Sequence, residues 1–204
     1  MNGFQLLDYF GVAMFAATGA LAASRKQADI IAFVFLGTVT GVGGGTLRDL
    51  ILGVPVFWVE QPRFLSVCIL TAVAVYFTAH HLESRHRTLL WLDAVALASY
   101  GVLGAHRSLQ ITDSAEVAVI MGMMTGTAGG ILRDVLSSEP SVLMREEVYI
   151  TAAMSGALIF VTGQALGLPL AYAAGGGTLL AFGVRSGAIS RGWRLPRYRS
   201  RRVG

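Results

Sequence analysis

Long apolar stretches separated by short polar connections constrain this chain more than any other feature. Seven such stretches are bounded by charged or turn-forming residues, at 6–24, 29–52, 64–80, 89–105, 115–136, 149–166 and 169–185. A helix that crosses a membrane needs roughly 20 apolar residues. Hydrophobic side chains make up 54% of the 204 residues and charged ones only 14%. We therefore expect an all-α integral membrane protein with seven transmembrane helices.

These stretches leave no room for a separate soluble domain. We expect residues 1–190 to form a single transmembrane domain and residues 191–204 to form a basic cytoplasmic tail. The N-terminal segment lacks the basic residues that precede a cleavable signal sequence, so the first helix is expected to be permanent. The tail would act as a topology anchor or as a segment that binds lipid headgroups or a partner.

The positions of Lys and Arg predict the orientation in the membrane. With the N-terminus outside, the outer loops hold Arg63 and Arg107. The inner side then holds Arg25, Lys26, Arg85, Arg87, Arg145, Arg185, Arg191, Arg194, Arg197, Arg199, Arg201 and Arg202. Short cytoplasmic loops carry an excess of basic residues. We expect a multi-pass protein of the cell inner (plasma) membrane, with its N-terminus outside and its C-terminus in the cytoplasm.

The chain contains an internal repeat. A shift of 85 residues superposes residues 7–55 on residues 92–140 with fifteen identities, which include five glycines, an Asp-Arg-Asp set and a proline. Repeat one covers about 6–80 and repeat two about 89–166, and helix seven, about 169–185, lies outside both. Because each unit has three spans, the second must enter the membrane from the opposite side. The pattern predicts two inverted three-helix repeats, an arrangement in which sites lie near the midplane between the repeats.

A glycine-rich run lies in the second helix of each repeat, at Thr40–Asp49 and Thr125–Asp134. Glycine costs roughly 1 kcal/mol relative to alanine inside a helix, which favours a kink or an unwound turn that lines a wet cavity. The same glycines have the three- and four-residue spacings that allow close helix packing. The duplication of the run favours a conduction or binding site over packing alone.

Each glycine run ends in an intramembrane Arg-Asp pair, and such charges need partners or water. Neighbouring residues on a helix point in different directions, so Arg48 is not expected to be neutralised by Asp49. By topology, Arg48 lies level with Asp8 and Arg133 level with Asp93. We therefore predict two supporting ion pairs, Asp8 with Arg48 and Asp93 with Arg133. The arginines would act as electrostatic gates; the alternative is that the four charges only fix helix register.

The candidate ion pathway combines the glycines with hydroxyls and charges of both runs. It consists of Thr40, Gly41, Gly43, Gly44, Gly45, Thr46, Arg48, Asp49, Thr125, Gly126, Thr127, Gly129, Gly130, Arg133 and Asp134.

The paired motifs GVGGGTLRD and GTAGGILRD, each followed by a proline, resemble those of the bacterial trimeric intracellular cation (TRIC) channel family. This resemblance implies a homotrimer that conducts monovalent cations, chiefly potassium, through a pore in each protomer between helices 2 and 5. It implies no cofactor beyond the permeant K⁺ and no nucleic-acid partner; membrane lipid is the expected surrounding. Animal members carry a lipid-binding Lys-Glu-Val motif where this chain has Thr127, Ala128 and Gly129, which argues against that regulation here.

Other functions fit less well. A secondary transporter of a small zwitterion such as glycine, a label also attached to this family's domain, would suit inverted repeats equally. A retinal protein is excluded because Lys26, the only lysine, is not in the last helix. An enzyme is not expected, because the chain has no HExxH motif and its four histidines lack metal-ligand spacing.

Overall fold

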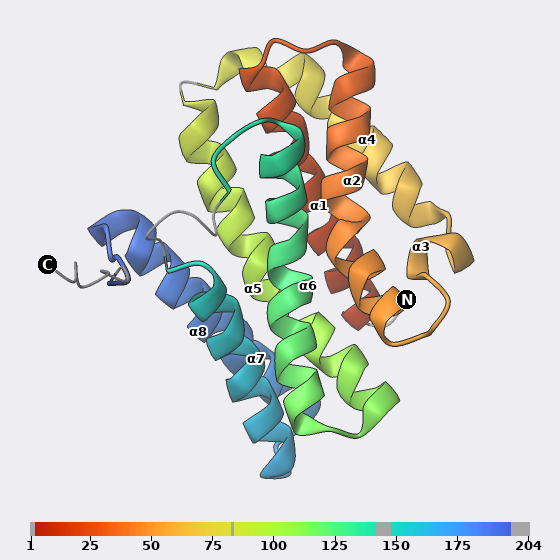
Figure 1. Ribbon diagram of the computed structural model, residues 1–204, viewed down its shortest axis with the longest axis vertical. Coiled ribbons are helices and arrows are strands. Elements are labelled where there is room, and N and C mark those ends of the chain that lie inside the picture. The colour runs from red at the N-terminus through yellow and green to blue at the C-terminus, as the bar shows by residue number, and fades with distance from the viewer. Residues whose placement is uncertain (1–2, 83, 142–147, 197–204) are drawn as a thin grey trace, which may run out of the picture.

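The computed structural model describes residues 3–82, 84–141 and 148–196. The helices are α1 (Gly3–Arg25), α2 (Ile30–Ile51), α3 (Phe57–Glu60), α4 (Arg63–Thr78), the 3₁₀ turn η1 (Ala79–His81), α5 (Arg85–Thr112), α6 (Ala115–Leu136), α7 (Ile150–Ala165) and α8 (Leu170–Arg191) (Figure 1). All elements of these ranges are helical, which confirms the predicted all-α class.

Five of the helical segments are long and apolar enough to cross a membrane. They are Gln5–Arg25, Ile30–Ile51, Arg63–His81, Arg85–Thr112 and Ala115–Leu136. The helix α7 is a shorter apolar helix, and α8 is continuous over 22 residues that include the Gly175–Gly177 run. Large hydrophobic side chains such as Ile31, Leu70 and Leu179 lie exposed on the outer surface, as expected for helices that face lipid. These features identify a multi-pass membrane protein.

The helices form two bundles that meet mainly along two helix pairs. The helices α1, α2 and α4 pack against one another, and so do α5, α6 and α7. The bundles are joined by α1 against α5 and by α2 against α6, and α8 covers α5 and α7 on the side away from α2 (Figure 1). The α2–α6 contact therefore lies at the boundary between the two sequence repeats.

Local signals explain where the helices start and stop. Asp29, Ser84 and Ser114 each accept a backbone N–H from the first turn of α2, α5 and α6 respectively, the usual role of an N-cap side chain. At the other ends, Gly192 has a positive φ of 68° after α8, a conformation that glycine adopts without strain. These caps set the ends of the bundle.

Two helices differ from their predicted ranges. The predicted span 89–105 is part of the longer α5, which extends into polar residues at both ends. The predicted span 169–185 is α8, which continues to Arg191, so Arg185 lies well inside the helix and not at its end. Capping explains the earlier start of α5, because the Ser84 N-cap lets the helix begin at Arg85, four residues before the predicted span.

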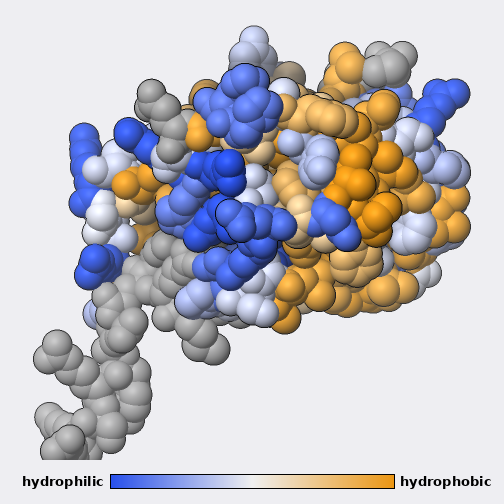
Figure 2. Space-filling model, turned by 90° about the horizontal axis from the view of Figure 1, so that it is seen from above, coloured by the Kyte–Doolittle hydropathy of each residue, from blue (hydrophilic) through white to orange (hydrophobic). Residues whose placement is uncertain are grey.

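The end of the molecule that carries the α1–α2 connection also carries the start of α5, because the Arg85 Nη1 donates to the Ser24 carbonyl oxygen at 3.2 Å. Viewed onto this end, hydrophilic residues gather over one part of the surface and hydrophobic residues over one flank (Figure 2). The polar end face and the apolar flank are the surfaces expected of a bundle whose ends meet water and whose sides meet lipid.

Candidate functional site

The glycine runs bring α2 and α6 into contact across the boundary between the bundles. A Cβ atom at Gly44 would overlap the Thr125 carbonyl oxygen, and a Cβ at Gly129 would lie 2.6 Å from the Thr40 carbonyl oxygen. Gly44 and Gly129 occupy the same repeat position, and so do Thr40 and Thr125. The two helices therefore cross through a reciprocal contact in which each glycine meets the backbone of the other helix.

The prediction of an unwound turn in the glycine runs is wrong. Both runs are continuous α-helix, within Ile30–Ile51 and Ala115–Leu136. The physical reason is packing: the missing side chains let the backbones of α2 and α6 approach each other. The backbone groups stay bonded within each helix, and the close contact offsets the lower helix propensity of glycine.

Of the remaining glycines of the two runs, Gly43 also faces the other bundle, and the others pack inside their own bundles. A Cβ at Gly41 would lie 3.2 Å from the Val12 carbonyl oxygen, and one at Gly126 would lie 2.9 Å from the Leu97 carbonyl oxygen. Gly45 faces the Phe57 ring, whereas Gly130 faces Tyr149 and Asp93, and Gly43 faces Leu132 of α6. Val12 and Leu97 are again 85 residues apart, so the repeat extends to the contacts between helices.

Arg48 is bound by its sequence neighbour, so the predicted Asp8–Arg48 pair is wrong. The Asp49 Oδ1 accepts the Arg48 Nε at 2.8 Å and lies 2.7 Å from Nη2. The Asp49 Oδ2 accepts the Phe57 backbone N–H at 2.9 Å. The argument from helix geometry failed because a guanidinium on a long side chain can curl back to the next residue, although the two Cβ atoms point apart.

Arg133 lies in a denser network, which contains the predicted pair with Asp93. Its Nη1 lies 2.6 Å from the Asp93 Oδ1 and donates to the Thr18 Oγ1 at 3.1 Å. Its Nη2 lies 2.9 Å from the Asp134 Oδ1, which repeats the Arg48–Asp49 arrangement. Arg133 is 3% exposed and Asp93 is 1% exposed, so this network is a buried charge cluster.

Each arginine borders a polar pocket at its own end of the bundle. Arg48, Asp8, Glu60 and Arg107 line a pocket of about 250 Å³, which we call the outer pocket after the orientation predicted from the loop charges. Arg133 borders a pocket of about 10 Å³, the inner pocket, whose walls include the polar residues Arg25, His86, Asp93, Asp134, Ser137, Glu139 and Arg185. The α2–α6 crossing lies between the two. The pocket beside Arg48 is therefore much larger than the pocket beside Arg133.

The four threonines of the glycine runs keep their hydroxyl protons within their own helices. The hydroxyls donate to the carbonyl four residues earlier, Thr40 to Leu36 and Thr125 to Met121 at 2.6 Å each, and Thr46 and Thr127 at 2.8 Å. Thr46 also accepts the Trp58 indole N–H at 2.8 Å. Their oxygens remain available as acceptors, but Thr40 and Thr125 are fully buried at the crossing.

Two contributions to the inner pocket were missed by sequence reasoning. Arg185 of α8 is 1% exposed, and its guanidinium carbon lies 5.0 Å from the centre of the Tyr149 ring. Glu139 lies 3.0 Å from the Lys26 Nζ and 3.6 Å from the Arg25 Nη2, so an ion cluster bridges the start of the α1–α2 connection and the end of α6. A signal for Arg185 existed: Ala181 and Ala188 continue the helical spacing on both sides of it.

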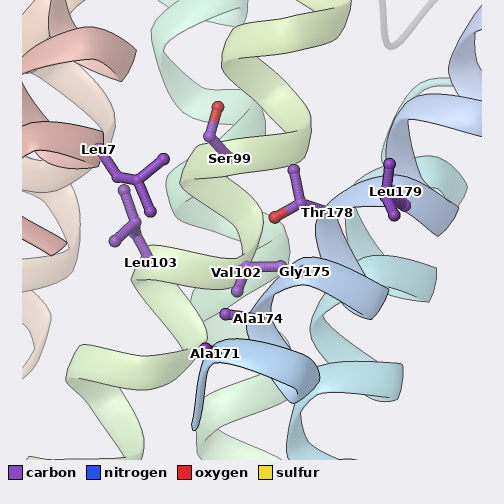
Figure 3. A pocket seen from close by; sticks show the side chains of 9 residues that line it. All are labelled: Leu7, Ser99, Val102, Leu103, Ala171, Ala174, Gly175, Thr178 and Leu179. Atoms are coloured by element: carbon purple, nitrogen blue, oxygen red, sulfur yellow. The ribbon is translucent and has the colours of Figure 1, made fainter. Parts of the chain in front are cut away.

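A larger pocket of about 460 Å³ lies elsewhere, between α1, α5 and α8 (Figure 3). Its walls are mostly apolar, with Leu7, Val102, Leu103 and Leu179 among them, and its polar side chains are Ser99 and Thr178. A hydrated ion needs oxygen ligands to replace its water. This groove is therefore a poorer candidate for an ion site than the two polar pockets.

The comparisons with known proteins agree with this architecture. A family model described as glycine transporter matches residues 5–80 and 90–165. A UPF0126 membrane protein of Vibrio cholerae is 38% identical, over 95% of this chain and 82% of the relative. The UPF0126 inner membrane protein YadS of Escherichia coli K12 is 35% identical, over 94% of each chain.

A solved structure decides the family. The TRIC trimeric intracellular cation channel orthologue from Rhodobacter sphaeroides is 50% identical, with a TM-score of 0.92 over 95% of this chain and 100% of its own. The chain belongs to the TRIC family. A second solved TRIC cation channel is 27% identical, with a TM-score of 0.87 over 98% of this chain and 99% of its own. The TRIC resemblance of the doubled glycine motif is thereby confirmed.

Proposed function

We propose that this TRIC protein is a channel for monovalent cations, chiefly potassium, with a pore in each protomer between α2 and α6. The observation that carries the proposal is the position of the reciprocal Gly44 and Gly129 crossing between two polar pockets at opposite ends. The solved relatives support it, because they are described as TRIC cation channels, one of them solved in 0.5 M KCl.

The proposed path runs from the outer pocket past the crossing to the inner pocket. Separation of α2 from α6 at the crossing would expose the oxygens of Thr40 and Thr125 and the backbone beside the glycines to the path. Hydroxyl and carbonyl oxygens are the ligands that replace the hydration of a cation. In the closed arrangement these groups are buried, so conduction requires a movement of one bundle relative to the other.

The two arginines are proposed to gate this path from opposite ends. Arg48 borders the outer pocket and Arg133 the inner pocket, and a positive charge in a narrow low-dielectric passage repels cations. The ion pairs with Asp49 and Asp134 reduce that repulsion. A shift of either guanidinium toward or away from its carboxylate would then change the barrier for a passing cation.

The proposed topology has seven spans. Six of them form two inverted repeats of three helices, and α8 is the seventh. Contacts that recur at an offset of 85 residues support the repeats, as do the two segments of the family match. The TRIC relatives described as trimeric support a homotrimer. An inner-membrane location fits the E. coli relative, and the loop charges favour an outside N-terminus.

Planar-bilayer recording of the reconstituted protein tests the channel. We expect unitary potassium currents, which exceed the turnover of any alternating-access carrier, and a changed unitary conductance in Arg48→Gln. Arg63→Gln is the matched control, because Arg63 is an exposed arginine at the start of α4 that is not part of the wall of the outer pocket. Absence of unitary currents from correctly assembled protein would contradict the proposal.

A second candidate function is a secondary transporter of a small zwitterion such as glycine. The name of the matched family model supports it, and so does the outer pocket, which combines the carboxylates of Asp8 and Glu60 with the guanidiniums of Arg48 and Arg107. Such a site could hold both an ammonium and a carboxylate group. Saturable glycine uptake coupled to a proton or sodium gradient, without unitary currents, would favour this alternative.

A further inference from the structure

The chain folds back on itself after α8. Gly192 adopts a φ of 68°, and its N–H donates to the Ala188 carbonyl oxygen at 2.9 Å. Trp193 then lies against Gly187, where an added Cβ would come within 2.7 Å of the indole ring. The Arg191 guanidinium carbon lies 5.9 Å from the centre of the same ring. Residues 192–196, which we call the C-terminal hook, thus begin with a packed turn.

A pocket of about 200 Å³ lies between the hook, α8 and the start of α5. Arg185 and Arg194 provide its positive charge, and Trp193 contributes an indole ring. Leu90 of α5 and Ala188 and Ile189 of α8 form an apolar part of the wall. The pocket therefore combines two guanidinium groups with an apolar surface, a mixture that fits an amphipathic anion better than a free ion.

The place of this pocket along α8 indicates the membrane level at which it lies. Arg185 is six residues before the end of α8 at Arg191, a distance of about 9 Å along a helix axis. Under the proposed topology this end faces the cytoplasm. The cytoplasmic leaflet carries anionic lipids that attract basic residues, and Trp is enriched where headgroups meet acyl chains. The pocket reaches from the headgroup level into the apolar layer.

We infer that this pocket binds the headgroup phosphate of one anionic phospholipid, such as phosphatidylglycerol. Arg194 and Arg185 would hold the phosphate, because guanidinium groups pair with phosphate oxygens in a fork geometry. Leu90 and Ile189 would receive the first part of an acyl chain. The inference rests on the proposed orientation, and it does not require that the protein conducts ions.

The pocket shares a wall with the candidate ion pathway. Arg185 borders the inner pocket as well as this one, and the inner pocket contains the Arg133–Asp93 pair. A lipid phosphate held by Arg185 would draw the guanidinium away from the inner pocket and lower the positive charge there. The bound lipid would thereby favour cation passage at the inner end.

Native mass spectrometry of the purified full-length protein tests the site. The protein in detergent is titrated with phosphatidylglycerol, with phosphatidylcholine of the same acyl chains, and with sodium phosphate. We expect one tightly bound phosphatidylglycerol per chain, and a dissociation constant about fivefold higher in Arg194→Gln, the factor that corresponds to roughly 1 kcal/mol per basic residue at a membrane surface. Arg87→Gln is the matched control, because Arg87 is an exposed arginine of α5 that is not part of the pocket wall.

Three results would overturn the inference. Equal binding of phosphatidylcholine would show that the anionic headgroup is not recognised. Equal weakening in Arg194→Gln and Arg87→Gln would show general surface attraction. Displacement of the lipid by sodium phosphate at similar concentration would assign the pocket to free phosphate. Because Arg185 is buried and Arg185→Gln could disturb folding, Trp193→Leu on the exposed hook serves as the second variant, with the same expected loss of lipid affinity.

Discussion

At the residue scale, the two arginines that occupy the same repeat position have different surroundings. Arg48 is held by Asp49, with the Phe57 ring 5.9 Å away. Arg133 has two carboxylates and a hydroxyl as partners. Asp93 is buried against Arg133, whereas Asp8 lies half-buried in the wall of the outer pocket. The two repeats therefore place an Arg and an Asp at equivalent positions, but the ion pairs that these residues form differ between the repeats.

This difference predicts unequal effects of the same substitution. Asp93→Asn removes the carboxylate nearest to a buried guanidinium, and loss of one partner of a buried pair costs about 3 kcal/mol or more in soluble proteins. Asp8→Asn removes a carboxylate that forms no salt bridge in the described chain, and should cost less than about 1 kcal/mol. Thermal unfolding in detergent, followed by circular dichroism, measures the difference. Equal shifts of the unfolding temperature would contradict the described network.

The same comparison shows what sequence could and could not predict at this scale. Asp93 and Arg133 were paired correctly because the predicted helices place them at one membrane depth, and burial forces each to find the other. Asp8 and Arg48 were predicted at one depth too, but both line the outer pocket of about 250 Å³ and are not packed against each other as a salt bridge. The rotamer of Arg48, and hence its choice of Asp49, depends on tertiary space that a sequence does not show.

At the element scale, α2 and α6 show how one pattern can serve two structures. Glycines at three- and four-residue spacing permit an unwound turn or a close crossing, and helix propensity alone favoured unwinding. The partner helix decides which of the two structures forms. The Thr125 backbone of α6 lies against Gly44 of α2, and the Thr40 backbone of α2 lies against Gly129 of α6. Sequence predicted the helices correctly. It could not predict the crossing, because the partner helix is set by the packing of the two bundles.

The crossing predicts which glycines tolerate alanine. Gly44→Ala would place a Cβ against the Thr125 backbone, and overpacking of this kind costs typically about 1–3 kcal/mol; Gly129→Ala should behave alike. Gly183 of α8 is the control, because an added Cβ there meets nothing within 4 Å, and alanine stabilises a helix by up to about 1 kcal/mol over glycine. We expect a lower unfolding temperature for the first two variants and an equal or higher one for Gly183→Ala.

Unchanged stability of the glycine variants would contradict the close crossing of α2 and α6. If Gly44→Ala, Gly129→Ala and Gly183→Ala all unfold at the wild-type temperature, then α2 and α6 are not in close contact in the membrane protein.

Potassium flux into proteoliposomes gives a second measurement on the same variants. We expect flux to change in Gly44→Ala and to be unaffected in Gly183→Ala, because only the former alters the proposed pore.

At the scale of the whole molecule, the two ends of the bundle differ. The outer pocket holds about 250 Å³ and the inner pocket about 10 Å³. The inner end is also held by the ion pairs of Glu139 with Arg25 and Lys26 and by Arg185 of α8, which has no place in the repeat. The seventh long helix thus makes the molecule asymmetric. Sequence reasoning overlooked this because Arg185 was the last residue of the predicted span 169–185 and was given no partner inside the bundle.

The assignment of these ends to the two sides of the membrane can be tested with two matched cysteine variants. Gln61 lies beside the outer pocket and Gln27 in the α1–α2 connection, and both are exposed and uncharged, so neither substitution changes the loop charges that set orientation. The native Cys68 is fully buried and should add little background. In intact cells, a membrane-impermeant maleimide should label Gln61→Cys within minutes. It should label Gln27→Cys only after permeabilisation. The reverse pattern would invert the topology and place the wider pocket, together with Arg48, on the cytoplasmic side; it would also move the α8 pocket away from the anionic leaflet.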